Sequence, residues 1–93
     1  MVTVILQHEV KDFADWKKVF DADEPGRATA GVKLKVLYTS VKNPNDVTMI
    51  FEAPDAGVFN ILMSDSERQK NIQKAGVISK PIVSILNKIT SER

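Results

Sequence analysis

The chain contains no cysteine and a single histidine, His8, among its 93 residues. Without cysteine it can form no disulfide, no thiolate metal site and no cysteine nucleophile. One histidine also excludes a site that binds a metal through several histidines of the same chain. The lack of cysteine fits a reducing compartment, so we expect a cytoplasmic protein that uses neither a metal nor a cofactor.

An excess of charge of one sign is lacking as well. Thirteen basic and twelve acidic residues are interspersed along the chain, and the formal net charge is +1. The apolar stretch at residues 1–10 has no basic leader, no small-residue cleavage site and no run long enough to cross a bilayer. The composition therefore predicts neither nucleic acid nor a membrane as the main partner.

The length predicts one domain that spans residues 1–93. An apolar share of 43% is ordinary for a globular protein and argues against disorder. A chain this short buries only roughly 60–65% of its unfolded surface. Its core is therefore small, and association with a second copy would stabilise it.

Alternation of apolar and other residues predicts strands at residues 2–10, 32–41, 47–53 and 82–86. Apolar residues at helical spacing predict one helix between the first two strands and further helical segments between the last two. The turn formers at residues 42–46 join the second and third strands into a hairpin.

Helix ends are marked by residues with known end preferences. Asp12 and Asp55 are expected as N-caps, and Ser64 with Glu67 reads as a capping box for a helix at residues 66–75. Pro25 and Gly26 should end or kink the first helix. The polar tail, residues 88–93, is expected to fray.

The order βαββαβ predicts an α+β, ferredoxin-like fold, with a four-stranded antiparallel sheet and helices on one face. By parity, the open face would carry Ile5, Gln7, Leu37, Thr39, Thr48, Ile50, Glu52, Val83 and Ile85. About half of these are apolar, which predicts a two-fold homodimer through this face; the alternative is a solvated face with stray hydrophobics. No aromatic residue is predicted there, which argues against an RNA-recognition module.

His8 is the candidate catalytic residue, because parity places it on the helix-facing side of the first strand. A histidine there can act as a general base or hydrogen-bond a ligand; the alternative is a buried, neutral, fully partnered histidine. Arg27, after the Pro25 break, is expected as a solvated surface arginine, with carboxylate binding as the alternative.

Aromatic and apolar residues around His8 are expected to line a ligand pocket. The predicted lining residues are Trp16, Phe20, Tyr38, Phe59 and Met63. Ligand pockets are mostly apolar and aromatic, but the same residues also suit a filled core.

A family resemblance rests on one stretch above all: His8, Val10, Asp12, Phe13, Trp16, Lys17, Phe20 and Asp21. With the 43–46 hairpin and residues 75–77, it resembles the antibiotic-biosynthesis-monooxygenase-like dimeric α/β-barrel proteins. The resemblance implies a ferredoxin-like protomer whose sheet pairs with that of a second copy, and a small apolar pocket in each protomer. Relatives include cofactor-free monooxygenases, haem-degrading enzymes, muconolactone isomerases and polyketide cyclases. Haem is disfavoured here, because a strand is not where we expect its histidine ligand.

Two functions are compatible with these residues. The first is a cofactor-free monooxygenase-, isomerase- or cyclase-like enzyme acting on a small aromatic or polyketide-like molecule, with His8 handling a proton. The second is a non-catalytic ligand-binding or structural dimer. A cavity beside His8 is required by the first and not by the second.

Overall fold

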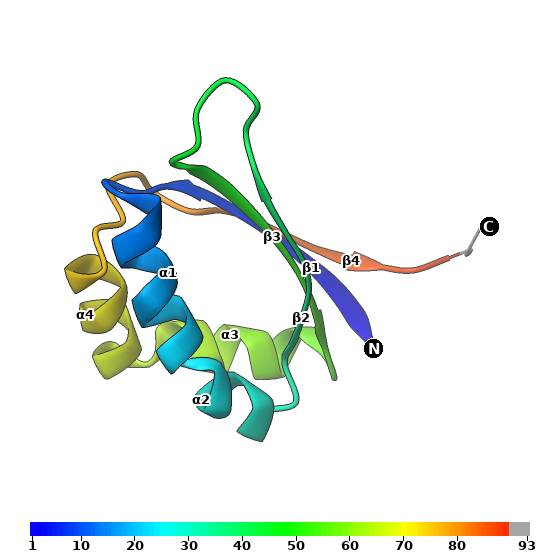
Figure 1. Ribbon diagram of the computed structural model, residues 1–93. Helices are drawn as coiled ribbons and strands as arrows, with labels where there is room; N and C mark the ends of the chain where they lie inside the picture. The colour runs from blue at the N-terminus through cyan, green and yellow to red at the C-terminus, as the bar shows by residue number, and fades with distance from the viewer. Residues whose placement is uncertain (90–93) are drawn as a thin grey trace.

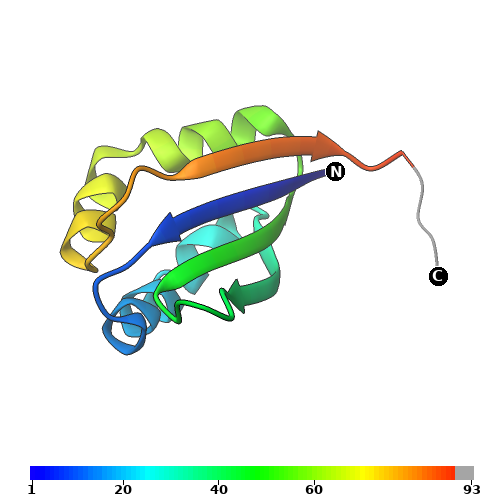
Figure 2. The ribbon, with the colours of Figure 1, turned by 90° about the horizontal axis from the view of Figure 1, so that it is seen from above.

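The computed structural model describes residues 1–89, so residues 90–93 of the predicted polar tail lie outside the described part. Its elements are β1 (Val2–Glu9), α1 (Phe13–Ala22), α2 (Glu24–Thr29), β2 (Lys33–Thr39), β3 (Asp46–Ala53), α3 (Ala56–Ser64), α4 (Ser66–Lys74) and β4 (Ile82–Asn87). The strands form one antiparallel sheet in the order β2-β3-β1-β4 (Figure 2). The helices lie together against one face of that sheet (Figure 1). The predicted ferredoxin-like α+β fold is confirmed.

Two of the predicted helix starts are confirmed by their caps. The carboxylates of Asp12 and Asp55 each accept a hydrogen bond from the backbone amide three residues later, at 3.1 and 2.8 Å. The predicted capping box at Ser64 is wrong, because Asp65 caps α4 and Ser64 is the last residue of α3. Only Asp65 separates the two helices, so Ser64 keeps helical geometry and cannot adopt the extended conformation of a cap.

The break after α1 falls one turn earlier than Pro25 itself. Helix α1 ends at Ala22, and Pro25 lies in the first turn of the short helix α2. Proline is tolerated there because the first amides of a helix have no intrahelical acceptor. Gly31 then ends the segment with a φ of 78°, a conformation that favours glycine. The two short helices together turn the chain back over the sheet.

The central strands β1 and β3 carry the core on their helix-facing side. Their register pairs Val4 with Phe51, Leu6 with Met49, and His8 with Val47. Residues directly opposite one another in an antiparallel pair share a face, and all six of these are buried. Trp16 and Phe59 close the core from the helix layer. The prediction that His8 lies on the helix-facing side is thus correct.

A β-bulge in β2 reverses the predicted parity of the second half of that strand. Leu34 pairs with Phe51, but the register shifts at the next residue and Val36 pairs with Ile50. An extra residue in one strand moves every later side chain to the other face. Tyr38 therefore lies on the open face of the sheet and Leu37 on the helix-facing side, contrary to expectation.

Strand β4 also has the opposite parity to the prediction. Its register pairs Ile85 with Val4 and Val83 with Leu6, so both lie on the helix-facing side. Ile82 and Leu86 lie on the open face instead. The two candidate faces of this strand are both apolar, so alternation could not decide between them.

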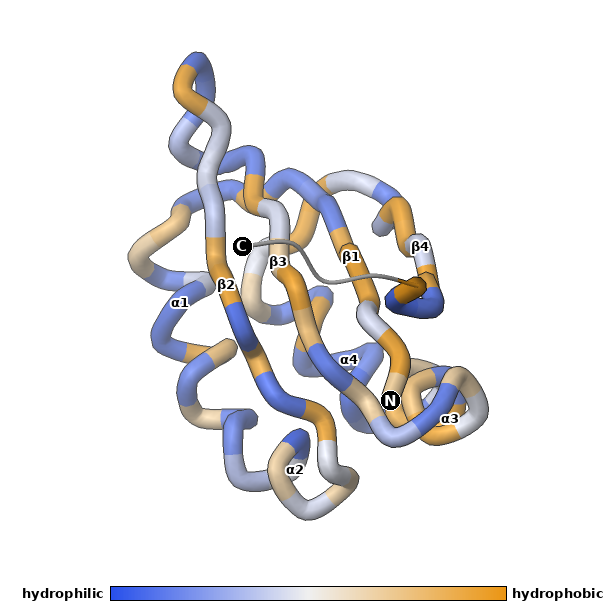
Figure 3. The backbone as a smooth tube through the Cα atoms, turned by 90° about the vertical axis from the view of Figure 1, so that its right-hand side faces the viewer, coloured by the Kyte–Doolittle hydropathy of each residue, from blue (hydrophilic) through white to orange (hydrophobic). Residues whose placement is uncertain are grey.

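The corrected open face carries apolar side chains on all four strands. Its apolar members are Ile5, Val36, Tyr38, Ile50, Ile82 and Leu86, and we call these six residues the open-face patch. Four of them are among the large hydrophobic side chains that remain exposed. Figure 3 views the sheet from this side, with the helices behind it. One aromatic, Tyr38, does lie on this face, which corrects the expectation that none would.

Candidate functional site

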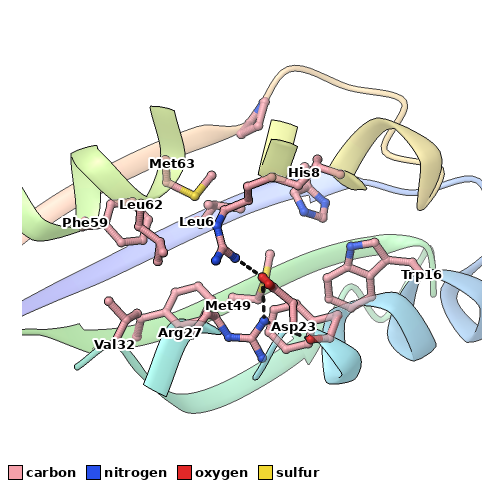
Figure 4. Close-up of a pocket in the computed structure, with 15 residues that line it drawn as sticks. Leu6, His8, Trp16, Asp23, Arg27, Val32, Met49, Phe59, Leu62 and Met63 are labelled. Atoms are coloured by element: carbon pink, nitrogen blue, oxygen red, sulfur yellow. Dashed lines mark hydrogen bonds and ion pairs between the residues drawn. The ribbon is translucent and has the colours of Figure 1, made fainter. Parts of the chain in front are cut away.

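A cavity lies between the sheet and the helices, next to His8 (Figure 4). Its lining residues are Leu6, His8, Trp16, Phe20, Asp23, Arg27, Val32, Met49, Phe51, Phe59, Leu62, Met63, Arg68, Ile72 and Pro81. The volume of the cavity is about 70 Å³. That is several times the roughly 10–15 Å³ that one water molecule needs.

The structure brings most of the predicted site residues together. His8 from β1, Trp16 and Phe20 from α1, and Phe59 and Met63 from α3 all line the cavity. Tyr38 does not, and its side chain is 54% exposed on the opposite face of the sheet. Its predicted place in the pocket is wrong, because the bulge in β2 reversed its direction.

His8 is held in an apolar setting at one end of the cavity. It is 7% exposed, and its ring meets Trp16 edge to face at a centroid distance of 5.6 Å. Its Nδ1 atom is buried and has no hydrogen-bond partner among residues 1–89. Burial lowers the pKa of His8, and the opposing effects of its own backbone and of Asp46 are smaller. The imidazole is therefore neutral at pH 7, and His8 is one of the residues that line the cavity.

A continuous aromatic wall runs from α1 across the sheet to α3. The rings of Trp16 and Phe20 stack with their centroids 4.8 Å apart. The centroid of the Phe51 ring lies 6.2 Å from those of both Phe20 and Phe59. Such pairs contribute about 0.5–1.5 kcal/mol each beyond their buried area. These residues belong to the hydrophobic core and also line the cavity, so the two roles expected for them are compatible.

Arg27 is a site residue that sequence reasoning misplaced. It is only 6% exposed, and its guanidinium lies 3.9 Å from the centre of the Phe20 ring. Its Nη1 donates a hydrogen bond to the Phe20 carbonyl at 2.9 Å and lies 3.5 Å from Asp23 Oδ2. The signal was the Asp23–Arg27 spacing of four residues, which places the two side chains on one helical face.

Arg68 of α4 joins the same cluster and was not predicted at all. Its Nη1 pairs with Oδ2 of Asp23, so a single carboxylate oxygen faces both guanidinium groups (Figure 4). The side chain of Arg68 is 14% exposed, and its Nε atom is buried without a partner among the described residues. Burial lowers the pKa of both arginines. Nothing in the local sequence around Arg68 marks this role, because its partners come from a different helix pair.

Residues 1–89 contain no group of three or more His, Cys, Asp or Glu side chains arranged to hold a metal ion. In the same part of the chain, no helix combines the length and the apolar character needed to span a membrane. What the cavity offers chemically is a neutral imidazole, two guanidinium groups, one carboxylate and apolar walls.

Comparison with known proteins places this fold. The family model described as "Domain of unknown function (DUF3764)" matches residues 1–84. No curated protein matches the chain. A solved antibiotic biosynthesis monooxygenase is similar at 18% identity and a TM-score of 0.71, covering 97% of this chain and 100% of the other. The cofactor-independent oxygenase SnoaB from Streptomyces nogalater is similar at 14% identity and 0.71, covering 97% and 94%.

A conserved protein from Methanosarcina mazei has the same fold, at 15% identity and a TM-score of 0.72, covering 94% of this chain and 91% of the other. Identities this low establish the fold and leave the activity open. The resemblance to the antibiotic-biosynthesis-monooxygenase-like fold is confirmed on these structures.

Proposed function

This chain belongs to the DUF3764 family, a family of unknown function. From its own residues we propose a cofactor-free enzyme in which His8 takes a proton from a small aromatic or polyketide-like ligand. The observation that carries the proposal is the buried Nδ1 of His8, which has no hydrogen-bond partner among residues 1–89 and belongs to a residue that lines the cavity. Buried polar groups are nearly always satisfied, and the exceptions call for an explanation. A ligand group that meets this nitrogen supplies one.

The lowered pKa of His8 keeps the imidazole in the neutral form that a base requires. A neutral imidazole accepts a proton, and the apolar walls keep water from competing for it. The proton moves from an acidic C–H or O–H of the ligand to the imidazole, and the electron pair stays on the ligand as an enolate or phenolate. Return of the proton to a different ligand atom completes an isomerisation, and the same anion is the intermediate that a cyclase- or monooxygenase-like reaction needs.

A test is proton–deuterium exchange at the acidic benzylic position of 2-tetralone, a small aromatic ketone, followed by proton NMR in D₂O. We expect the protein to accelerate exchange over buffer and His8→Gln to abolish the acceleration, a loss on the order of the 10²–10⁴-fold typical of a general base. Met63→Leu is the matched control, because it alters the cavity wall without removing a proton acceptor. Exchange by His8→Gln at the rate of the unaltered protein would rule out the proposed role.

We also infer that the protein works as a homodimer joined through the open-face patch. Apolar side chains lie on this face in all four strands, with Tyr38 54% and Ile82 65% exposed, and small proteins commonly cover such side chains by association. Lys35 and Glu52, whose charged atoms are 3.8 Å apart, add a polar pair to that face. A two-fold axis would bring the same patch of both copies together.

A non-catalytic ligand-binding or structural dimer is the second candidate. One observation favours it. Asp46 is the carboxylate whose charge acts on the pKa of His8, but it accepts a hydrogen bond from Gln7 at 3.2 Å and does not orient the imidazole. Paired bases are usually held in place by a third group. In this case the exchange assay would show no acceleration at all, while the oligomeric state would be unchanged.

A further inference from the structure

The charges that face the cavity do not balance. Arg27 and Arg68 contribute two positive charges and Asp23 one negative charge. Apart from these three and the neutral His8, every lining residue is apolar. The lining residues therefore carry one excess positive charge, and outside the lining Glu24 and Asp21 also act on Arg27.

The two arginines differ in how many of their N–H groups have a partner. Arg27 is engaged by the Phe20 carbonyl, by the Phe20 ring and by Asp23, and its position is fixed by the turn of α2. Arg68 has Asp23 as its single side-chain partner, and its buried Nε has none among the described residues. A buried guanidinium N–H without an acceptor is costly, because it has lost its water and gained nothing in return.

Arg68 also stands at a boundary between two hollows. A second hollow, between α1 and α4, has about 200 Å³ of room by the same measure. It shares Trp16, Phe20, Asp23, Arg68 and Ile72 with the inner cavity. The Asp23–Arg68 pair is thus part of a common wall, and a ligand larger than the inner cavity has room to extend past it.

We propose that the cavity binds a small monoanion with an aromatic body, and that its carboxylate-like group pairs with Arg68. The acid group would satisfy the free Nε and cancel the excess charge, while the ring would lie against Trp16 and Phe20. A guanidinium presents a fork of N–H donors that matches a carboxylate. This proposal deepens the proposed function, since it requires that the cavity take a small molecule and adds the charge of that molecule.

The choice of an anion over a neutral ligand follows from the same groups. A neutral molecule of the same shape would fill the apolar part equally well, but it would leave Arg27 and Arg68 sharing the single carboxylate of Asp23. A cation would meet a site that already carries positive charge. The structure therefore separates two ligands that differ only in charge, and this difference can be measured directly.

The experiment titrates the ¹⁵N-labelled protein with benzoate and with its neutral isostere benzamide, and repeats the pair with 2-naphthoate and 2-naphthamide. The signals followed are the indole N–H of Trp16, which is the chain's single tryptophan, and the Nε–H of Arg68. We expect each carboxylate to bind at least tenfold more tightly than its amide and to shift both signals.

Arg68→Gln should reduce the preference for the carboxylate to less than threefold. The matched control is Lys70→Gln, which removes the same charge from an exposed position of α4 that lines neither hollow; it should keep the preference. Should Arg68→Gln fail to fold, Arg68→Lys retains the charge without the Nε donor, and we expect it to bind the carboxylates more weakly than Arg68 does.

The outcomes separate this inference from the function on which it rests. If the amides bind as tightly as the carboxylates, the cavity is a ligand site but the anion proposal is wrong. If none of the four compounds shifts the Trp16 signal, the cavity binds no such molecule, and both proposals fall. A preference for carboxylates that Lys70→Gln removes as well as Arg68→Gln would be an effect of overall charge and would also overturn the assignment to Arg68.

Discussion

The indole of Trp16 and the imidazole of His8 meet in a T-shaped contact, at an interplanar angle of 79° and a centroid distance of 5.6 Å. This contact joins the first strand to the first helix at the point where the cavity begins. Nδ1 of His8 is buried and has no hydrogen-bond partner among residues 1–89. The burial that makes His8 a candidate base also makes it a source of pH dependence.

Replacing His8 should change how stability depends on pH. Because burial lowers the pKa of His8 in the folded state, the unfolded chain binds a proton at about pH 6.5 that the folded chain still refuses. The free energy of unfolding should therefore be fully retained above about pH 7 and fall as the pH drops below about 6.5. His8→Leu should flatten this dependence, since the chain has no other histidine.

Urea unfolding between about pH 5.5 and 7.5, at one protein concentration, measures this effect. The control is Lys17→Met, which removes an exposed charge of α1 outside the cavity and should leave the slope unchanged. Equal slopes for the unaltered protein and His8→Leu would contradict the prediction.

Charge placed on the open-face patch should dissociate the proposed dimer. Tyr38→Lys and Ile82→Lys each place a charge within the proposed interface, one on each edge strand of the sheet, so the dissociation constant should rise by about tenfold or more. Ile61→Lys is the control, because Ile61 is 74% exposed on α3, away from this face. Sedimentation velocity over a range of concentrations gives the result, and a monomer at every concentration of the unaltered protein would refute the interface.

The start of α4 distinguishes the capping residue in the structure from the one that the sequence pattern predicts. Asp65 accepts a hydrogen bond from the Arg68 amide at 3.0 Å, whereas the hydroxyl of Ser64 bonds to the Ile61 carbonyl. Asp65→Ala should cost about 1 kcal/mol of unfolding free energy, and Ser64→Ala less than about 0.5 kcal/mol. Thermal or urea unfolding of both variants tests this, and the reverse order would restore the capping box.

Gly31 should be sensitive to any side chain. Its φ of 78° disfavours other residues, and a Cβ there would lie 3.0 Å from Cγ of Pro54. Gly31→Ala should destabilise the protein by about 1–3 kcal/mol. Gly31→Asn meets the same contact but tolerates the backbone angle better, so it should cost less. Comparison of the two unfolding free energies isolates the backbone contribution, and equal costs would assign the whole effect to the contact with Pro54.

Much of the fold followed from local patterns in the sequence. Alternation located β1 and β3, and because both have one apolar face, parity alone placed His8 toward the helices. Asp12 and Asp55 marked helix starts because their caps use neighbouring amides. Helical spacing likewise placed Trp16, Phe20, Phe59 and Met63 on the sheet-facing side of their helices, where they line one cavity.

The errors arose where a distant partner decided the outcome. Tyr38 changed face because of a bulge that depends on pairing with β3, and Val83 and Ile85 changed face because β4 is apolar on both sides and takes its register from β1. Arg27 was expected in solvent, but the fold of α2 over the sheet buried it beside Phe20.

By itself, the sequence determined the order of the strands, the helix caps at Asp12 and Asp55 and the helix-facing position of His8, since each depends on residues a few positions apart. Only the tertiary structure decided which face Tyr38 takes and that Asp23 lies between Arg27 and Arg68. Arg68 is 45 residues from Asp23 in the chain, and no local periodicity carries information over that separation. The charge of the cavity therefore depends on how the two helix pairs pack, whereas its apolar lining residues can be predicted from their spacing in the sequence.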